Sequence, residues 1–186
     1  MHSFKLLIAT VLLAGLLGSA AAEAGPKIRL STSMGDIDIE LNQEKAPKTT
    51  AHILKLVDDG FYDGLVFHRV LANFVIQAGG YLPNLEYREP PGTVANESSN
   101  GLSNVKGSVA MARLSDPDSA DAQFYINVND NTRLDATPSQ PGYTVFGKVV
   151  AGWDTVVEIE LTDVGMSQGM AGVPETPVII HKASRL

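Results

Sequence analysis

The chain has 186 residues, a formal net charge of −7 and no cysteine. That length allows one domain with a real hydrophobic core. An acidic chain without Lys/Arg clusters argues against binding to nucleic acid or anionic lipid, because both are bound through their phosphates. The absence of cysteine excludes disulfides, thiolate nucleophiles and cysteine metal sites, and we expect neither a metal nor another cofactor.

The N-terminus predicts an export signal rather than part of the fold. Lys5 supplies a positive charge, an apolar run covers Leu6 to Leu17, and Ala20-Ala21-Ala22 offers an A-x-A cleavage site. The run is shorter than the roughly 20 residues of a spanning helix, and an uncleaved membrane anchor is the alternative. We expect residues 1–22 to be a cleaved signal peptide and residues 23–186 to form one domain, exported to the periplasm and free of the membrane.

A β-hairpin is predicted directly after this segment. Lys27–Ser31 and Asp36–Leu41 each alternate polar and apolar residues and are separated by a Gly-containing turn, which is typical of a hairpin with one face on a core. We interpret the acids Asp36, Asp38 and Glu40 as a solvated strand face rather than a cation site, because no Gly-bearing ligand loop accompanies them.

Two short helices are predicted. The first begins at Ala46-Pro47, where proline is tolerated in the first turn, and ends at Gly60. Its apolar stripe consists of Ile53, Leu54 and Val57. The second covers Gly152–Ile159, and its expected buried side consists of Trp153, Val156 and Val157.

The rest of the chain predicts short strands between Gly/Pro-rich loops. The longest loops are Tyr81–Ser103 and Arg133–Gly142. The apolar runs are Val66–Leu71, Phe74–Ala78, Gly107–Ala112, Phe124–Val128, Thr144–Val150 and Pro177–His181. With the hairpin they make about eight strands, a pattern typical of a β-barrel or a β-sandwich. Periodicity does not choose between the two.

The stretch from Val66 to Gly80 places polar side chains in an apolar frame. A buried Arg or Gln must find partners or cost several kcal/mol, so a strand that only built a core has little use for them. Arg69, Val75 and Gln77 would share one face of an uninterrupted strand, but the chain breaks at Ala72-Asn73. An edge strand with Arg69 and Gln77 facing solvent stays open.

The same stretch carries a family resemblance. Phe67-His68-Arg69-Val70 followed by Phe74–Gly80 resembles the central signature of the cyclophilin family of peptidyl-prolyl cis-trans isomerases. Three later stretches resemble the family in the same order, and they are Gly107–Arg113, Ser119–Asn127 and Val145–Val149. The resemblance runs from about Ile28 to the C-terminus. It implies a mainly β fold, a closed eight-stranded antiparallel barrel with a short helix over each end.

The implied activity is rotation about X–Pro bonds in unfolded or extended chains, which assists the folding of exported proteins. The resemblance assigns the catalytic set to Arg69, to Gln77, which also orients Arg69, and to His68, which shapes the site. The implied substrate-binding residues are Phe74, Val75, Ala112, Arg113, Gln123, Tyr125, Leu134 and Tyr143. Among these, Gln123 bonds the substrate backbone together with Gln77, and Ala112 and Arg113 run along the residues that precede proline.

Several residues depart from the commoner family pattern. Val75 replaces Met, Tyr125 replaces Phe, and Arg113 stands where eukaryotic members usually carry Asn. Arg133 occupies the position of the Trp that many eukaryotic members use to bind cyclosporin, so we expect weak cyclosporin binding. An insertion at Ala136–Gly142 resembles the bacterial exported branch.

The residues themselves bear on three other functions. His52, His68 and His181 show no ligand spacing, so a zinc site is not expected. A Ser/His/Asp hydrolase around His68 stays open, because triads assemble in space. A binding module that holds Pro-containing segments without turnover is the second hypothesis, but it would need the pocket and not Arg69. We expect a monomer, because no large exposed apolar face is evident.

Overall fold

The computed structural model describes residues 25–186, so the predicted signal peptide and its cleavage site lie outside the described residues. Eight strands form one antiparallel sheet in the order β10-β1-β2-β7-β5-β6-β4-β3, and β8 pairs with β9 in a separate hairpin. The strands are β1 (Lys27–Thr32), β2 (Gly35–Leu41), β3 (Phe67–Leu71), β4 (Val75–Ala78), β5 (Ser108–Met111), β6 (Phe124–Asn127), β7 (Val145–Ala151), β8 (Val164–Ser167), β9 (Met170–Pro174) and β10 (Ile180–Arg185).

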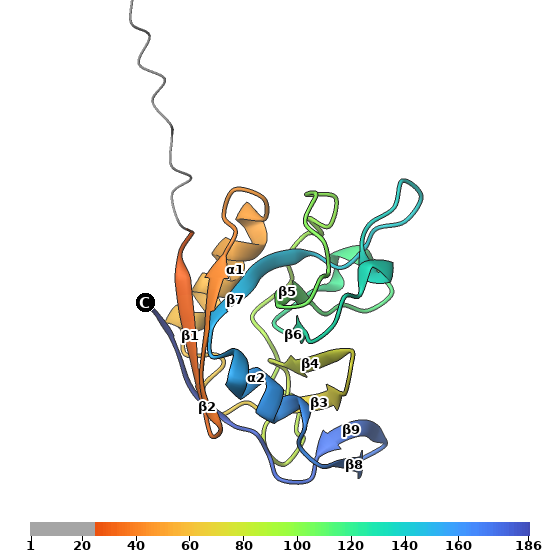
Figure 1. The fold of residues 1–186 in the computed structure, drawn as a ribbon. Coiled ribbons are helices and arrows are strands. Elements are labelled where there is room, and N and C mark those ends of the chain that lie inside the picture. Colours follow the sequence, from red (N-terminus) through yellow and green to blue (C-terminus); the bar gives the residue numbers. More distant parts are fainter. Residues whose placement is uncertain (1–24) are drawn as a thin grey trace, which may run out of the picture.

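The sheet is strongly curled (Figure 1). Irregular pairing between Val109 and Ala110 on β5, and at three other strand pairs, adds local twist of the kind that bulges produce. Within residues 25–186 no ladder pairs β3 with β10. The two ends meet instead at an isolated bridge from Val66 to Ile179 and in a few backbone hydrogen bonds around it, such as that from Phe67 N–H to the oxygen of Val178 at 3.0 Å. The mainly β prediction is confirmed, whereas the paired strands form an open half-barrel and full closure stays a prediction.

Both predicted helices are present. Helix α1 covers Pro47–Asp58 with proline in its first turn, and α2 covers Trp153–Glu160. Helix α1 contacts β10, whereas α2 contacts β2, β3 and β4. The predicted buried side of α2 is partly wrong, because Val156 and Ile159 are buried while Trp153 and Val157 are only half-buried. Val156 and Ile159 are three residues apart and therefore lie on one helical face.

The strands β4, β5 and β6 and the first half of β7 bury both of their faces. Buried side chains on one face belong to the main core, which they share with both helices and which includes Ile76, Val109, Ile126 and Phe146. Neighbouring residues on the same strands form a second, smaller apolar cluster around Val75, Ala110, Tyr125 and Val145. Successive side chains of a strand point to opposite faces, so this sheet separates the main core from a second buried region.

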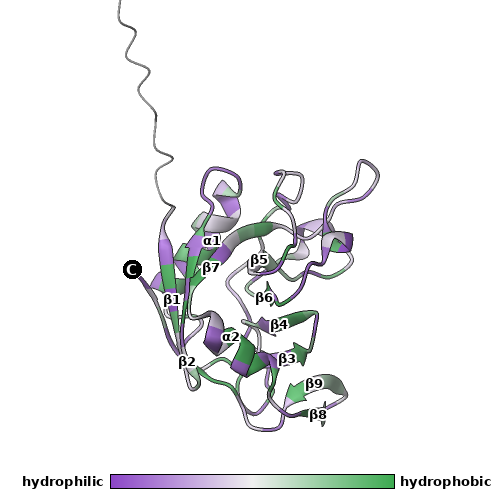
Figure 2. Cartoon of the chain, in the orientation of Figure 1, coloured by the Kyte–Doolittle hydropathy of each residue, from purple (hydrophilic) through white to green (hydrophobic). Residues whose placement is uncertain are grey.

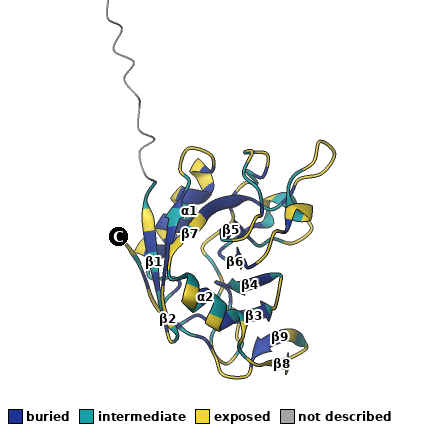
Figure 3. Cartoon of the chain, in the orientation of Figure 1, coloured by how far each residue is buried: buried dark blue, intermediate teal, exposed yellow. Residues whose placement is uncertain are grey.

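The distribution of polarity agrees with this layout. Figure 2 shows hydrophobic residues concentrated on the strands and helices, while the connecting loops are more hydrophilic. Figure 3 shows buried residues mainly on the central strands, such as β4, β5 and β6, and exposed residues at the loop tips. The described residues contain no helix that is both long and apolar enough to cross a membrane.

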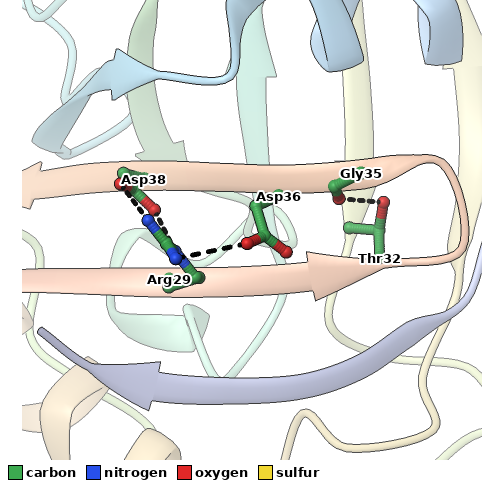
Figure 4. Close-up of polar contacts among 5 residues, drawn as sticks. All are labelled: Arg29, Thr32, Gly35, Asp36 and Asp38. Carbon is green, nitrogen blue, oxygen red and sulfur yellow. Dashed lines mark hydrogen bonds and ion pairs between the residues drawn. The ribbon is translucent and has the colours of Figure 1, made fainter.

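The hairpin β1–β2 corrects one expectation about its acids. Asp38 is buried rather than solvated, and both of its carboxylate oxygens accept hydrogen bonds from Arg29, at 2.7 and 2.8 Å. Arg29 also pairs with the exposed Asp36 at 3.3 Å (Figure 4). The hydrogen bonds from Arg29 hold the pKa of Asp38 below its ordinary value, although partial burial opposes them. Asp36 and Asp38 are thus both partners of Arg29, whereas Glu40 pairs with Lys148.

The C-terminal region differs most from the prediction. The hairpin of β8 and β9 was not predicted, and β9 packs against β3 at the edge of the main sheet. The last strand begins at Ile180 and ends at Arg185, later than the predicted Pro177–His181. Its position follows its partner, because Ile28 of β1 pairs with Arg185 and Leu30 with Ala183.

Candidate active site

The turn between β3 and β4 brings Arg69 opposite Gln77. Asn73 has a positive φ of 58° and reverses the chain, and the two strands then pair with Arg69 beside Gln77. Arg69 Nη1 donates to Gln77 Oε1 at 3.2 Å, and Gln77 Nε2 donates to Gln123 Oε1 at 3.1 Å. Strand β3 lies at the edge of the sheet, as the alternative of an edge strand predicted. Arg69 does not extend freely into solvent, however, because its side chain is half-buried and hydrogen-bonded to Gln77 on the neighbouring strand.

The apolar cluster on the outer face of β4, β5, β6 and β7 lies next to this chain of hydrogen bonds, since Gln77 pairs with Tyr125 across β4 and β6. Its buried members are Val75, Ala110, Tyr125 and Val145. The half-buried residues around them are Phe74, Leu102, Ala112, Leu134 and Tyr143. All six apolar or aromatic residues predicted to bind substrate belong to this cluster, so the structure brings them together beside Arg69.

A network of polar side chains is hydrogen-bonded to the apolar cluster through the hydroxyl of Tyr125. The hydroxyl of Tyr125 donates to Asn104 Oδ1 at 2.8 Å, which satisfies the extra polar atom of this tyrosine. Asn104 in turn donates to Asp135 through its backbone and its side chain, and Ser103 donates to the same carboxylate. Burial raises the pKa of Asp135, but the hydrogen bonds from Ser103 and Asn104 outweigh it and leave the pKa below its ordinary value. Asp135 therefore stays charged at neutral pH and fixes Asn104, the acceptor of the Tyr125 hydroxyl.

Arg113 does more than the prediction assigned to it. Its guanidinium donates to the backbone oxygens of Leu114, Pro141 and Gly142, at 2.8, 3.0 and 3.2 Å. Its Cζ lies 4.7 Å from the centre of the Tyr143 ring. The side chain therefore ties the predicted insertion to the end of β5 and stacks on one wall of the cluster.

A groove of about 630 Å³ continues from Arg69, Gln77 and Gln123. Sequence reasoning missed part of its lining, namely Tyr81, Tyr87, Asp121 and Met170. Tyr87 donates to Asp121 at 2.6 Å, and the rings of Tyr81 and Tyr87 are 5.4 Å apart. Asp121 could have been found from the sequence, because it lies inside one of the stretches that resemble the family. Tyr81 and Tyr87 lie in a long loop whose sequence shows no pattern that would place them at the groove.

His68 is placed differently from the other predicted catalytic residues. It is 4% exposed, its ring centre lies 4.5 Å from that of Tyr81, and its Nδ1 has no hydrogen-bond partner among residues 25–186. Burial lowers the pKa of His68 to about 4, and the charge of Arg69 adds to the effect. The imidazole is therefore neutral at physiological pH and forms a wall of the groove.

Two glycines at the end of β4 allow the close approach of Gln123. Gly79 has a φ of +95°, and a Cβ there would lie 2.5 Å from the carbonyl oxygen of Ala122. A Cβ on Gly80 would lie 2.8 Å from the side chain of Gln123. Because glycine lacks this atom, Gln123 can reach Gln77.

A larger hollow elsewhere does not share this chemistry. It has about 850 Å³ and is lined by residues such as Pro26, Glu40, Leu102 and Lys148. None of the predicted catalytic residues lines it. No group of three or more His, Asp and Glu residues able to hold a metal ion occurs within residues 25–186.

Comparison with known proteins identifies the family. Residues 27–185 match the family model for cyclophilin type peptidyl-prolyl cis-trans isomerase/CLD. A peptidyl-prolyl cis-trans isomerase of Acinetobacter baylyi is 44% identical over 173 residues, covering 91% of this chain and 90% of the relative. One from Streptomyces antibioticus is 46% identical over 162 residues, covering 86% and 98%.

A solved structure shows the same fold. The crystal structure of a Cryptosporidium parvum cyclophilin, in the presence of the dipeptide Ala-Pro, has a TM-score of 0.70 and 24% identity, covering 84% of this chain and 96% of that chain. The sequence left two hypotheses, an isomerase and a module that binds Pro-containing segments without turnover, and the family match favours the isomerase. The chain belongs to the cyclophilin-type peptidyl-prolyl cis-trans isomerases, and it is an isomerase enzyme.

Proposed function

We propose that Arg69 is the catalytic group and that the apolar cluster around Val75 and Tyr125 holds the proline ring of the substrate. The observation that carries this proposal is the hydrogen-bonded chain from Arg69 through Gln77 to Gln123, which runs beside that cluster. The chain fixes a charged donor at the edge of an apolar pocket, and no bond-breaking nucleophile is needed.

Rotation about an X–Pro bond faces a barrier of roughly 18–20 kcal/mol, because amide resonance is lost when the bond twists. The trans form is favoured by only about 0.5–1 kcal/mol, so the enzyme does not have to drive the equilibrium. In the twisted state the prolyl nitrogen becomes pyramidal and regains a lone pair. A donor held against that lone pair binds the twisted state better than either planar state, and such differential binding lowers the barrier.

The surroundings of Arg69 suit this role. An arginine remains charged at any working pH and presents rigid, forked donors, and Gln77 fixes the direction of one of them. His68 is neutral at physiological pH and adds no competing charge. Gln123 lies where it can bond the backbone of the substrate, and the aromatic rings of Phe74 and Tyr125 offer apolar walls to a proline ring.

We further propose that the substrates are proline-containing segments of unfolded or extended chains in the periplasm, and that the enzyme acts as a monomer in the folding of exported proteins. The predicted signal at residues 1–22 supports export. The related Cryptosporidium protein crystallised with Ala-Pro supports proline peptides as ligands. Fractionation of cells that produce the full chain tests the location, and sedimentation of the domain tests the monomer.

Two-dimensional exchange NMR on a short Ala-Pro-containing peptide, combined with shift mapping on the labelled protein, tests the site. We expect cis–trans cross-peaks with catalytic amounts of enzyme, and peptide-induced shifts at Ala110, Gln123 and Tyr125. Shifts confined to the larger hollow around Glu40 and Lys148 would contradict the proposed site even if exchange is observed.

Cyclosporin offers a second check on the pocket rim. The position at which many eukaryotic members carry a cyclosporin-binding Trp is Arg133 here, and this exposed side chain stacks on Phe74. We expect inhibition of the wild-type enzyme only at micromolar or higher cyclosporin, because a charged group replaces a large apolar contact. Inhibition at nanomolar concentration in the same exchange assay would refute this expectation.

A further inference from the structure

Three guanidinium groups surround the proposed proline pocket of a protein whose net charge is −7. Arg69 is bonded to Gln77 on one side of the pocket. Arg113 and Arg133 lie over the rings of Tyr143 and Phe74, each with its Cζ 4.7 Å from the ring centre. None of the three pairs with a carboxylate among residues 25–186, although Arg29 and Arg185 on other surfaces do.

The three groups differ in what their donors do. Arg69 donates one hydrogen bond to Gln77, and Arg113 donates to the backbone oxygens of Leu114, Pro141 and Gly142. The side chain of Arg133 donates to no acceptor within residues 25–186, and its guanidinium stacks on the ring of Phe74. Its side chain is thus exposed, oriented by an aromatic ring, and left with all its N–H groups available to a ligand.

The carboxylate next to Arg133 in the chain does not use these donors. Asp135 directs both oxygens to Ser103 and Asn104, below the apolar cluster. Asp121 lies at the groove beyond Gln123 and bonds Tyr87. The rim at Arg133 therefore presents an uncompensated positive charge beside Phe74.

We propose that Arg133 is a recognition site for an acidic side chain in the residue that follows the substrate proline. The proposal rests on the proposed function of the pocket. Ala112 and Arg113 form the flank assigned to the residues before proline, and the backbone N–H of Ala112 donates to the carbonyl oxygen of Gln123 at 2.9 Å. Arg133 lies on the flank of Phe74, which leaves it for the residue after proline.

The chemistry of the ligand follows from that of arginine. A guanidinium presents a planar fork that matches a carboxylate with two parallel hydrogen bonds. Stacking on Phe74 restricts the side chain before the substrate arrives, so less conformational entropy is lost on binding. Lysine has one compact charge in place of the fork, so Arg133→Lys should recover only part of the selectivity.

The test compares C-terminally amidated peptides Ala-Ala-Pro-Xaa-Ala, in which Xaa is Asp, Asn or Ala; amidation removes the terminal carboxylate as a second source of the same charge. We expect kcat/KM for the Asp peptide to exceed that for the Asn and Ala peptides by about threefold at low salt, the size of an exposed ion pair. The ratio should fall towards one in about 1 M salt, where charges are screened within a few ångströms.

Arg133→Gln should bring the ratio to about one, and Lys106→Gln is the matched control. Lys106 is also exposed and also stacks on an aromatic ring, that of Trp153 at 5.2 Å, but Trp153 packs against the main core, whereas Phe74 under Arg133 belongs to the apolar cluster of the pocket. The control removes the same unit of charge and should leave the ratio at about three.

A ratio of one in the wild type, or a ratio of three that survives in Arg133→Gln, would overturn the proposal. An equal loss in Lys106→Gln would assign the effect to net charge and overturn it as well. Because each ratio compares two peptides on one protein, it is independent of which residue catalyses rotation. Failure of the proposed catalytic role would instead be seen as full exchange in Arg69→Ala.

Discussion

Arg69→Ala is expected to lower kcat for X–Pro isomerisation by about 10²–10³-fold, the usual effect of removing one preorganised donor from an active site. The dissociation constant for a proline peptide should change by less than about threefold, because the pocket of Val75, Tyr125 and Leu134 does not depend on the guanidinium. An interaction made only in the transition state affects kcat and leaves ground-state binding in place. Exchange NMR gives the rate, and shift titration gives the dissociation constant.

Two further variants separate charge from direction. Arg69→Lys keeps the positive charge but loses the fork, and we expect it to recover only part of the lost rate. Gln77→Leu leaves Arg69 charged but removes the acceptor that orients it, and should also lower kcat. A kcat for Arg69→Ala above one tenth of the wild-type value would contradict the catalytic role.

Acidification should destabilise the wild-type protein more than the variant His68→Gln. Burial lowers the pKa of His68 to about 4 in the folded state, while an unfolded chain binds the same proton near pH 6.5. Between these values the unfolded state binds more protons, so stability falls as the pH falls from 6.5 to 4. The difference corresponds to roughly 3 kcal/mol at full effect. Urea unfolding of both proteins at pH 7 and at pH 4 measures it.

The comparison of the two proteins cancels the titration of the carboxylates, which they share. His181→Gln serves as the control, because it removes an exposed imidazole from β10 and should retain the full acid destabilisation of the wild type. Equal losses of stability in wild type and His68→Gln would show that His68 is protonated in the folded protein.

The elements that the sequence predicted best have strong local patterns. The alternation in β1 and β2 and the proline at the start of α1 are visible in a few residues, and the structure confirms both. The hairpin β8–β9 lacks such a pattern. No residue of β8 is buried, and its residues alternate only between exposed and half-buried, so the strand needs no regular row of apolar side chains. Its turn uses Gln168 and Gly169, both with positive φ. Glutamine rarely adopts that conformation, so the turn could not be recognised from its sequence.

The site shows the same division between local and distant information. The resemblance assigned Arg69, Gln77 and the pocket residues, and the structure brings them together. Tyr81 and Tyr87 reach the groove because the long loop folds back on itself in an isolated bridge between them. Only the three-dimensional course of that loop places them there. Likewise, the side-chain bonds of Arg113 depend on an insertion that is distant in sequence.

The alternation of side chains on β4, β5 and β6 has a consequence for how this enzyme can diversify. Ile76, Val109 and Ile126 pack into the main core, while their neighbours on the same strands form the pocket. Selection on the pocket can therefore change ligand preference with little effect on the residues that hold the domain together. A library that randomises Val75 and Ala110 should contain many more folded members than one that randomises Ile76 and Val109.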